Sequence, residues 1–233
     1  TRNRVKPGND LSTLKVNGTS SSVAFVYRYP IIRTRRMNLN FSTTYDYLNS
    51  ETDLSKVRFT LDRIESARMG ISFDALDAWR GINLITANVS HGLNMLSGKE
   101  QQSSLRSRAD GRKDYAKADA SYTRLQYLPA NFSFYLAFSG QYAFNALLSA
   151  EEFGYGGPEF GSAYDSSEII GDHGFAGKAE LRYNSPNRGQ LFRTTQYYAS
   201  YDAGAVWDKH DRTSTGKDSA SSAATGIRLG LAD

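Results

Sequence analysis

Long runs in which every second residue is apolar or aromatic constrain this chain more than any other feature. The clearest run is residues 131–144, and its apolar face carries Phe132, Phe134, Leu136, Phe138, Tyr142 and Phe144. The opposite face is mainly polar, which is typical of a β-strand with one apolar and one wet side. At about 3.3 Å per residue this strand would be well over about 30 Å long. That is long for a soluble sandwich and suits a strand tilted across a membrane.

Eight further segments follow the same pattern, and we expect strands at 22–29, 37–47, 57–75, 82–91, 117–128, 175–183, 195–207 and 223–231. The alternation changes phase near Leu84 and Ile85, which is typical of a β-bulge, and residues 117–128 are too polar for their faces to be assigned. Short connectors (30–36, 76–80, 128–130 and 184–194) alternate with long ones (48–56, 92–116, 145–174 and 208–222). Outer-membrane barrels alternate short periplasmic turns with long extracellular loops. We therefore predict an all-β fold, an antiparallel transmembrane β-barrel.

Composition agrees with a barrel. Mean hydropathy is −0.52, and no segment has the apolar length of a membrane helix. A barrel strand tolerates such polarity because half of its residues face a wet lumen. The 15 Tyr and 12 Phe against 2 Trp suit interfacial girdles. With 28 basic and 24 acidic residues well mixed, the net charge of +4 forms no nucleic-acid footprint.

No catalytic or metal centre is indicated by residue spacing. The chain has no cysteine, and His91, His173 and His210 do not lie at metal-ligand spacing from one another. No GxSxG elbow supports a hydrolase, and His173 is better explained as a loop residue beside a turn than as a ligand or base. The glycines at 154, 156 and 157 lack the buried strand and helix start of a nucleotide loop. We expect no catalysis, metal, cofactor or nucleotide.

The connector at 145–174 is long enough that a function is expected for it. The strands that follow carry alternating charges: Lys178, Glu180, Arg182, Asp202 and Arg228. A charge on the lipid-facing side costs about 2–4 kcal/mol near the bilayer midplane, so these five side chains are expected to face the lumen. They either solvate the lumen or hold the long loop inside the barrel, and the pattern leaves both interpretations open.

Residues 147–183 resemble the signature of the haemolysin secretion/activation family, the outer-membrane transporters of two-partner secretion. The matching pieces, in order, are 149–153, 156–157, 164–165, 171–174 and 180–183. Weaker matches at 28–33, 124–129, 139–142, 201–206 and 226–229 extend the resemblance over nearly the whole chain.

The resemblance implies a sixteen-stranded barrel that follows two periplasmic POTRA domains, with its sixth extracellular loop folded into the lumen. In the family, the tip of that loop carries an arginine in a (V)RG(F/Y) motif, which pairs with an acidic residue of the barrel wall. Here the matching residues are Gly161, Ser162, Ala163 and Tyr164, and Asp202 matches the acidic partner. Serine cannot form a bidentate ion pair, so Asp202 would pair instead with Arg228 or Lys178.

On this mapping, residues 1–233 are a partial C-terminal barrel domain covering about strands six to fourteen, with the POTRA domains and terminal strands outside it. The implied function is export of a large haemolysin- or adhesin-class exoprotein across the bacterial outer membrane, with that exoprotein and lipid as partners and no nucleic acid. The loop would be a plug or export element comprising Gly156, Gly157, Phe160, Gly161, Ser162, Ala163, Tyr164, Asp165, Gly171, Asp172, His173 and Gly174. An assembly barrel of the same superfamily, a passive porin-like channel and a soluble β-sandwich module remain alternatives.

Overall fold

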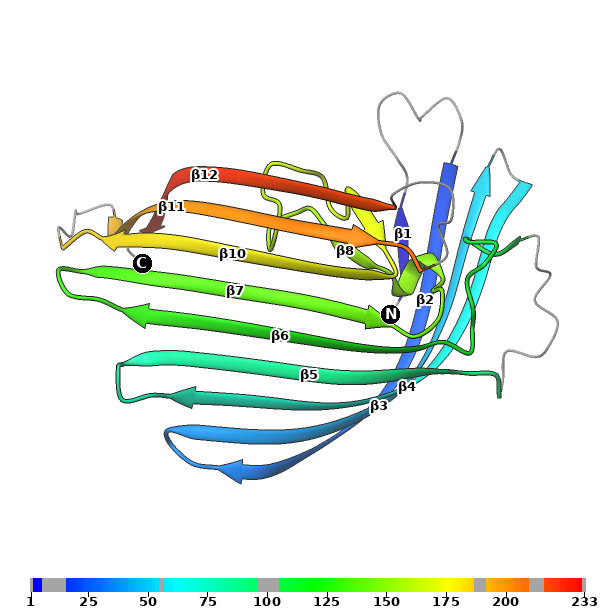
Figure 1. Cartoon of the computed structure of the whole chain (residues 1–233), viewed down its shortest axis with the longest axis horizontal. Coiled ribbons are helices and arrows are strands. Elements are labelled where there is room, and N and C mark those ends of the chain that lie inside the picture. Colours follow the sequence, from blue (N-terminus) through cyan, green and yellow to red (C-terminus); the bar gives the residue numbers. More distant parts are fainter. Residues whose placement is uncertain are drawn as a thin grey trace.

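Most of the chain forms one curved antiparallel sheet of ten strands (Figure 1). The structure is a computed structural model that describes residues 2–5, 16–54, 57–95, 105–186, 192–209 and 216–231. In sheet order the strands are β1 (Arg2–Val5), β2 (Val16–Arg33), β3 (Met37–Leu54), β4 (Val57–Leu76), β5 (Gly81–Leu93), β6 (Ala116–Tyr127), β7 (Phe132–Ala143), β10 (His173–Asn184), β11 (Phe192–Trp207) and β12 (Lys217–Leu231). Strands adjacent in the sheet are adjacent in the chain except β7 and β10, because a hairpin of β8 (Phe153–Tyr155) and β9 (Ile169–Gly171) lies between them in sequence. Among the described residues, β1 and β12 are the two edges of this sheet.

The apolar faces predicted from the alternation share one side of the sheet. Phe138 pairs with Gly177 on β10 and Tyr122 on β6, and Phe175 pairs with Ala205 on β11, which places these side chains on one common face. Phe175 is 53% exposed, as a lipid-facing side chain should be in the absence of lipid. The polar side chains of the same strands face the concave side. In the described ranges, no helix is long and apolar enough to cross a membrane.

All nine predicted strands are present, and the main error concerns their ends. Residues 48–56 were expected to be a long loop, but β3 continues to Leu54 and pairs with β4 up to Val57. Residues 49–53 (Asn-Ser-Glu-Thr-Asp) are polar on both faces, because strand ends that rise above the membrane meet water on both sides. The alternation that marks a membrane strand is therefore lost there although the strand persists.

The bulge predicted near Leu84 and Ile85 is also wrong. Strand β5 pairs with β4 and β6 without a register shift, and Leu84 lies on the concave face opposite Asp74 and Thr123. Strand β6, whose faces were not assigned, places Ala118, Ala120 and Tyr122 outward.

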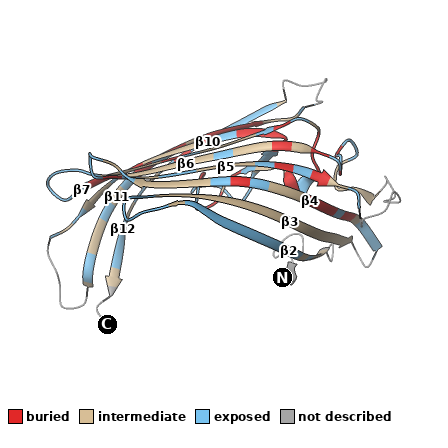
Figure 2. Ribbon diagram, turned by 90° about the horizontal axis from the view of Figure 1, so that it is seen from below, coloured by how far each residue is buried: buried red, intermediate tan, exposed pale blue. Residues whose placement is uncertain are grey.

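Buried residues gather towards the end of the sheet that carries the long connectors (Figure 2). Two apolar clusters lie on the concave side. One, at that end, contains Ile64, Tyr115, Ala143, Leu147 and Leu148. The other contains Ala137, Tyr155, Phe160 and Ala176. Both include residues of the long connector, so this connector folds into the space that the sheet encloses.

Candidate functional site

The long connector between β7 and β10 lies against the concave wall of the sheet. It begins with a short 3₁₀ turn, η3 (Ser149–Glu151), and its β8–β9 hairpin packs on β10 and β11. Tyr155 is fully buried, and a Cβ at Gly204 would lie 2.3 Å from its ring. The wall beneath the hairpin also carries Ala137 and Ala176. Small wall residues therefore leave the room that the aromatic side chains of the loop fill.

Asp202 on β11 holds the tip of this loop. Its Oδ1 accepts hydrogen bonds of 2.7 Å each from the Tyr155 hydroxyl, the Gly161 N–H and the Ser222 hydroxyl. Its Oδ2 accepts a longer one, 3.3 Å, from the Ser162 hydroxyl. Gly161 has a φ of 81°, a left-handed conformation that glycine adopts without the steric cost borne by other residues. The 1% exposed carboxylate is thus satisfied by neutral donors, three of which come from the loop.

Neither expected cationic partner forms an ion pair with Asp202, so that expectation is wrong. Lys178 donates to the Ser162 hydroxyl and to the Pro158 carbonyl, both at 3.3 Å. Arg228 is engaged elsewhere, with Glu180. With Ser162 in place of an arginine, hydroxyl and backbone donors hold the loop tip on Asp202, a contact we call the tip latch. Lys178 contacts Ser162 rather than Asp202.

The remaining wall charges pair with one another. Arg228 makes a bidentate contact with Glu180 at 2.7 and 3.0 Å, and Arg182 donates to the same carboxylate at 2.6 Å. The guanidinium of Arg182 lies over the Tyr135 ring, and that of Arg228 lies over the Tyr198 ring. Both interpretations of the five charges thus have a structural counterpart. Asp202 and Lys178 contact the loop, whereas the other three form a network on the lumen wall.

The base of the loop is attached through two adjacent glutamates that point in different directions. Glu151 pairs with Arg68 of β4 at 2.6 Å and with Lys117 of β6 at 2.8 Å. Glu152 pairs with Arg108, which comes from the β5–β6 connector, at 2.6 Å. Burial opposes ionisation of Glu151, but hydrogen bonds and charge from Arg68 and Lys117 outweigh it and lower its pKa.

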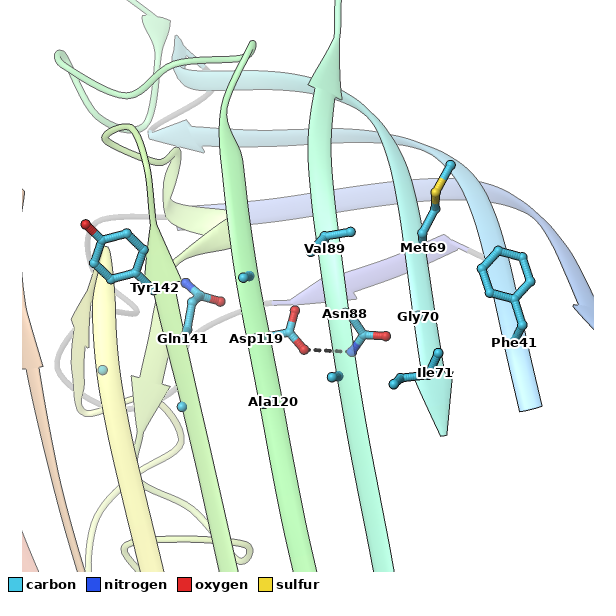
Figure 3. A pocket seen from close by; sticks show the side chains of 14 residues that line it. Phe41, Met69, Gly70, Ile71, Asn88, Val89, Asp119, Ala120, Gln141 and Tyr142 are labelled. Carbon is cyan, nitrogen blue, oxygen red and sulfur yellow. Dashed lines mark hydrogen bonds between the residues drawn. The ribbon is translucent and has the colours of Figure 1, made fainter. Parts of the chain in front are cut away.

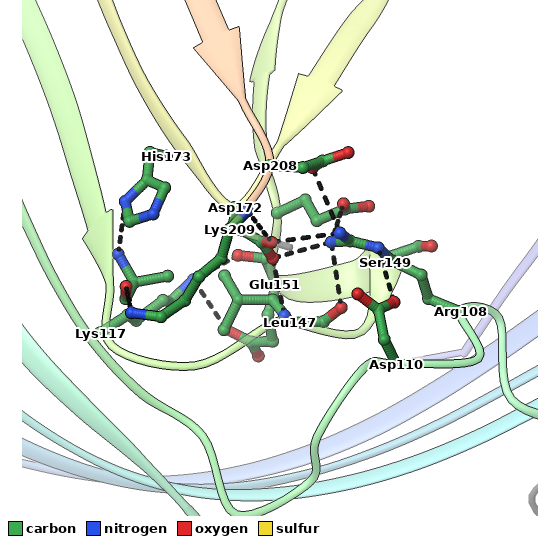
Figure 4. Close-up of polar contacts among 12 residues, drawn as sticks. Arg108, Asp110, Lys117, Leu147, Ser149, Glu151, Asp172, His173, Asp208 and Lys209 are labelled. Atoms are coloured by element: carbon green, nitrogen blue, oxygen red, sulfur yellow. Dashed lines mark hydrogen bonds and ion pairs between the residues drawn. The ribbon is translucent and has the colours of Figure 1, made fainter. Parts of the chain in front are cut away.

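Asp172 lies at the centre of the contacts between connectors (Figure 4). Its carboxylate is fully buried and accepts hydrogen bonds from Arg108 at 2.7 Å and from the backbone N–H groups of Leu147 and Lys209 at 2.7 and 3.0 Å. Burial acts to raise the pKa of Asp172, but these donors outweigh it, and the pKa is lowered. One side chain therefore joins the three long connectors that precede β6, β10 and β12.

Asp172 also belongs to the group of carboxylates, with Glu152 and Asp208, whose oxygens lie within 4.8 Å of one another. The Arg108 guanidinium lies among them, 2.6 to 3.3 Å from each, and pairs with Asp110 as well. The protein itself thus supplies the positive charge that such a group of carboxylates requires. Burial still raises the pKa of Glu152, against the opposing charge of Arg108.

The other predicted loop residues divide by exposure. Gly157, Phe160, Gly161, Gly171, Asp172, His173 and Gly174 are buried, whereas Ser162, Ala163, Tyr164 and Asp165 are exposed. His173 is the first residue of β10 rather than a loop residue: its Nδ1 accepts the Ala143 N–H at 3.2 Å, and its ring stacks on Trp207. A Cβ at Gly174 would lie 2.2 Å from the Phe153 ring. His210 lies outside the described residues.

Several residues of the site carried no signal in the sequence. Arg108 and Tyr115 belong to the long connector expected at 92–116, whose described part, 105–115, packs at the mouth of the sheet. Tyr155 and Ser222 complete the contacts of Asp202, but hydroxyl side chains are common and give no pattern of their own. Glu151 and Glu152, by contrast, lie in a piece, 149–153, that the resemblance includes.

A hollow of about 720 Å³ lies away from this site (Figure 3). Phe41, Met69, Ile71, Val89 and Tyr142 line it from the outer face, around the small residues of β5, β6 and β7. It is an apolar depression on the lipid-facing side of the sheet, opposite to the face that holds the loop.

One family model matches most of the chain, and two solved structures match its fold. The family model described as haemolysin secretion/activation protein ShlB/FhaC/HecB matches residues 2–229. The fold is similar to CdiB from Escherichia coli (TM-score 0.80, 14% identity, 93% of this chain and 40% of that chain covered) and to CdiB from Acinetobacter baumannii (TM-score 0.70, 18% identity, 98% and 39% covered). No curated protein matches. The chain spans about two fifths of the length of these solved chains, and the likeness confirms the predicted antiparallel barrel fold.

Proposed function

Because this chain belongs to the haemolysin secretion/activation family of two-partner secretion, whose members are β-barrel proteins of the outer membrane, we propose that it forms part of the conduit for a large partner exoprotein. The exoprotein would cross the barrel unfolded, with lipid around the wall. POTRA domains outside residues 1–233 would capture it. No nucleotide or nucleic acid enters this mechanism.

One observation carries the proposal: the long loop occupies the lumen side of the wall and is held there by Asp202. A chain in transit needs the space that Tyr155 and Phe160 fill, so the loop must move or guide the exoprotein past it. The tip contacts suit a movable element, since hydrogen bonds from hydroxyl and backbone groups are replaced by water when the tip leaves. A passive porin would need a constriction, but no contact of this kind at the base and tip of one loop.

The loop tip can be removed at a point where its ends already meet. The Ser167 N–H donates to the Gly156 carbonyl at 3.4 Å, so deleting residues 157–166 joins two neighbouring positions. We expect this deletion, in the protein expressed at full length with its exoprotein, to abolish release of the exoprotein into the medium. Glu159→Gln, an exposed change in the same segment, is the matched control.

Heat-modifiable migration of the folded barrel would verify that the deletion variant still inserts. Undiminished release from a correctly inserted deletion variant would refute the role of the loop in export. Loss of release in Glu159→Gln as well would show that the assay responds to any change in the segment.

A further inference from the structure

A second set of contacts lies at the end of the sheet that carries the long connectors, away from Asp202. Its apolar part, which we call the mouth plug, consists of Tyr115 from the β5–β6 connector and Leu147 and Leu148 from the long loop. All three side chains are fully buried and pack on Ile64 and Ala143. A connector that only covers a surface would leave such side chains partly in water. These pack as a core inside the mouth.

Charged groups tie the mouth plug to the wall. In the chain, Glu151 lies 83 residues after Arg68, beyond strands β5, β6 and β7, yet it receives two hydrogen bonds from Arg68, at 2.6 and 3.2 Å. Arg68 also pairs with Asp46 of β3 at 2.7 Å. The Tyr115 hydroxyl bonds to Ser66 Oγ at 2.8 Å, next to this network. Breaking a buried, hydrogen-bonded ion pair is costly because it leaves an uncompensated charge.

The two ends of the loop are held by different chemistry. Neutral donors hold the tip at Asp202, whereas ion pairs and a small apolar core hold the base. No residue of the mouth plug contacts Asp202 among the described interactions. The two sets of contacts are therefore separate in the described part of the chain.

We propose that the mouth plug is an extracellular closure of the barrel that is independent of the loop tip, with Glu151 and Arg68 as its positioning residues. This rests on the proposed export function, for which both closures must open in turn. Long connectors mark the extracellular end of outer-membrane barrels. The mouth plug thus lies at the extracellular end of the barrel, while the contacts of Asp202 with the loop tip lie deeper in the lumen.

Accessibility of a single cysteine tests the proposal directly, because residues 1–233 contain none. Ser66→Cys places a thiol of similar size on β4 beneath the Tyr115 hydroxyl, at a residue that is fully buried. A charged maleimide added to intact cells that produce the full-length protein should label this thiol slowly. Ala150→Cys, at an exposed position of η3, gives the labelling rate for an open site.

In the Ser66→Cys protein, we expect Glu151→Gln to accelerate labelling of the thiol about tenfold or more, and Asp202→Asn to leave the rate unchanged. Replacing both Leu147 and Leu148 by serine should have the same effect as Glu151→Gln without altering any charge, and Leu148→Met should preserve protection. In planar bilayers, the Glu151→Gln, Asp202→Asn double variant should conduct more than either single variant, as two closures in series require.

Rapid labelling at position 66 in the protein that carries only Ser66→Cys would overturn the proposal, because the mouth would then be open. Equal acceleration by Asp202→Asn would overturn the independence of the two closures. Labelling needs no exoprotein, so a failure of secretion that leaves the thiol at position 66 protected counts against the export function and leaves the closure standing.

Discussion

Removing the Asp202 carboxylate should release the loop tip, even though no arginine pairs with this carboxylate. When the tip leaves the wall, the hydrogen bonds lost are those from Tyr155, Gly161 and Ser162, while the bond from Ser222 on β12 stays. A hydrogen bond to a charged group contributes about 1.5–3 kcal/mol and a neutral one about 0.5–1.5 kcal/mol. The two bonds of 2.7 Å from the loop therefore hold the tip by at least about 3 kcal/mol.

Hydrogen exchange followed by mass spectrometry measures this directly. A peptide over residues 156–165 contains four hydrogen-bonded amides, those of Gly156, Gly157, Gly161 and Tyr164. Exchange of such amides reports the population of the open form. Since about 1.4 kcal/mol corresponds to a factor of ten, Asp202→Ala should accelerate exchange by at least about a hundredfold.

Two milder variants make the prediction quantitative. Asp202→Asn keeps an oxygen acceptor but removes the charge, which weakens each of the two short hydrogen bonds from the loop by about 1 kcal/mol. The total of about 2 kcal/mol should accelerate amide exchange about thirtyfold. Ser162→Ala removes two long bonds of 3.3 Å, the one donated to Asp202 and the one accepted from Lys178, and should change exchange less than about tenfold. Unchanged exchange in Asp202→Ala, with the β10 and β11 amides equally protected, would refute the assignment of Asp202 as the latch.

Three further predictions follow from single contacts. The pKa of Asp172 is lower in the folded protein than its unfolded value of about 3.9, so ionised Asp172 stabilises the fold above that pH, and this stabilisation is lost as the pH falls through the folded pKa. Asp172→Asn should therefore lower the thermal midpoint at pH 7 and have less effect below about pH 4. Ser162→Arg should slow tip exchange about tenfold when combined with Lys178→Ala but gain less alone, because Lys178 Nζ lies 3.3 Å from the Ser162 hydroxyl. Gly174→Ala should destabilise the barrel by about 1–3 kcal/mol in denaturant titrations through its contact with the Phe153 ring, and Phe153→Leu in the same protein should restore part of the loss.

The sequence predicts the wall of this protein better than its interior. Lipid on one side and water on the other impose the alternation that marks residues 131–144 as a strand, and the pattern fails at residues 49–53, where water lies on both sides. The contacts of Arg108 were unpredictable, because its partners come from two other connectors, Glu152 and Asp172 from one and Asp208 from the other, and only the folded sheet brings them together. The alternation placed Asp202 in the lumen and the resemblance made it the acidic partner of the loop, but its donors depend on the path of the loop.

Unequal strand lengths make the rim of the barrel taller at β3 and β4 than at the neighbouring strand β5. The pairing of β4 with β5 stops at Glu65, so residues 57–64 rise beyond the neighbouring strand as a taller section of rim. The β5–β6 connector leans on this section, where the Ser107 N–H donates to Asp62 at 3.1 Å and Tyr115 packs on Ile64. By contrast, β6, β7 and β10 are only 12 residues long. In the export conduit proposed above, a polypeptide leaving the lumen would therefore pass a taller rim at β3 and β4 than at β5.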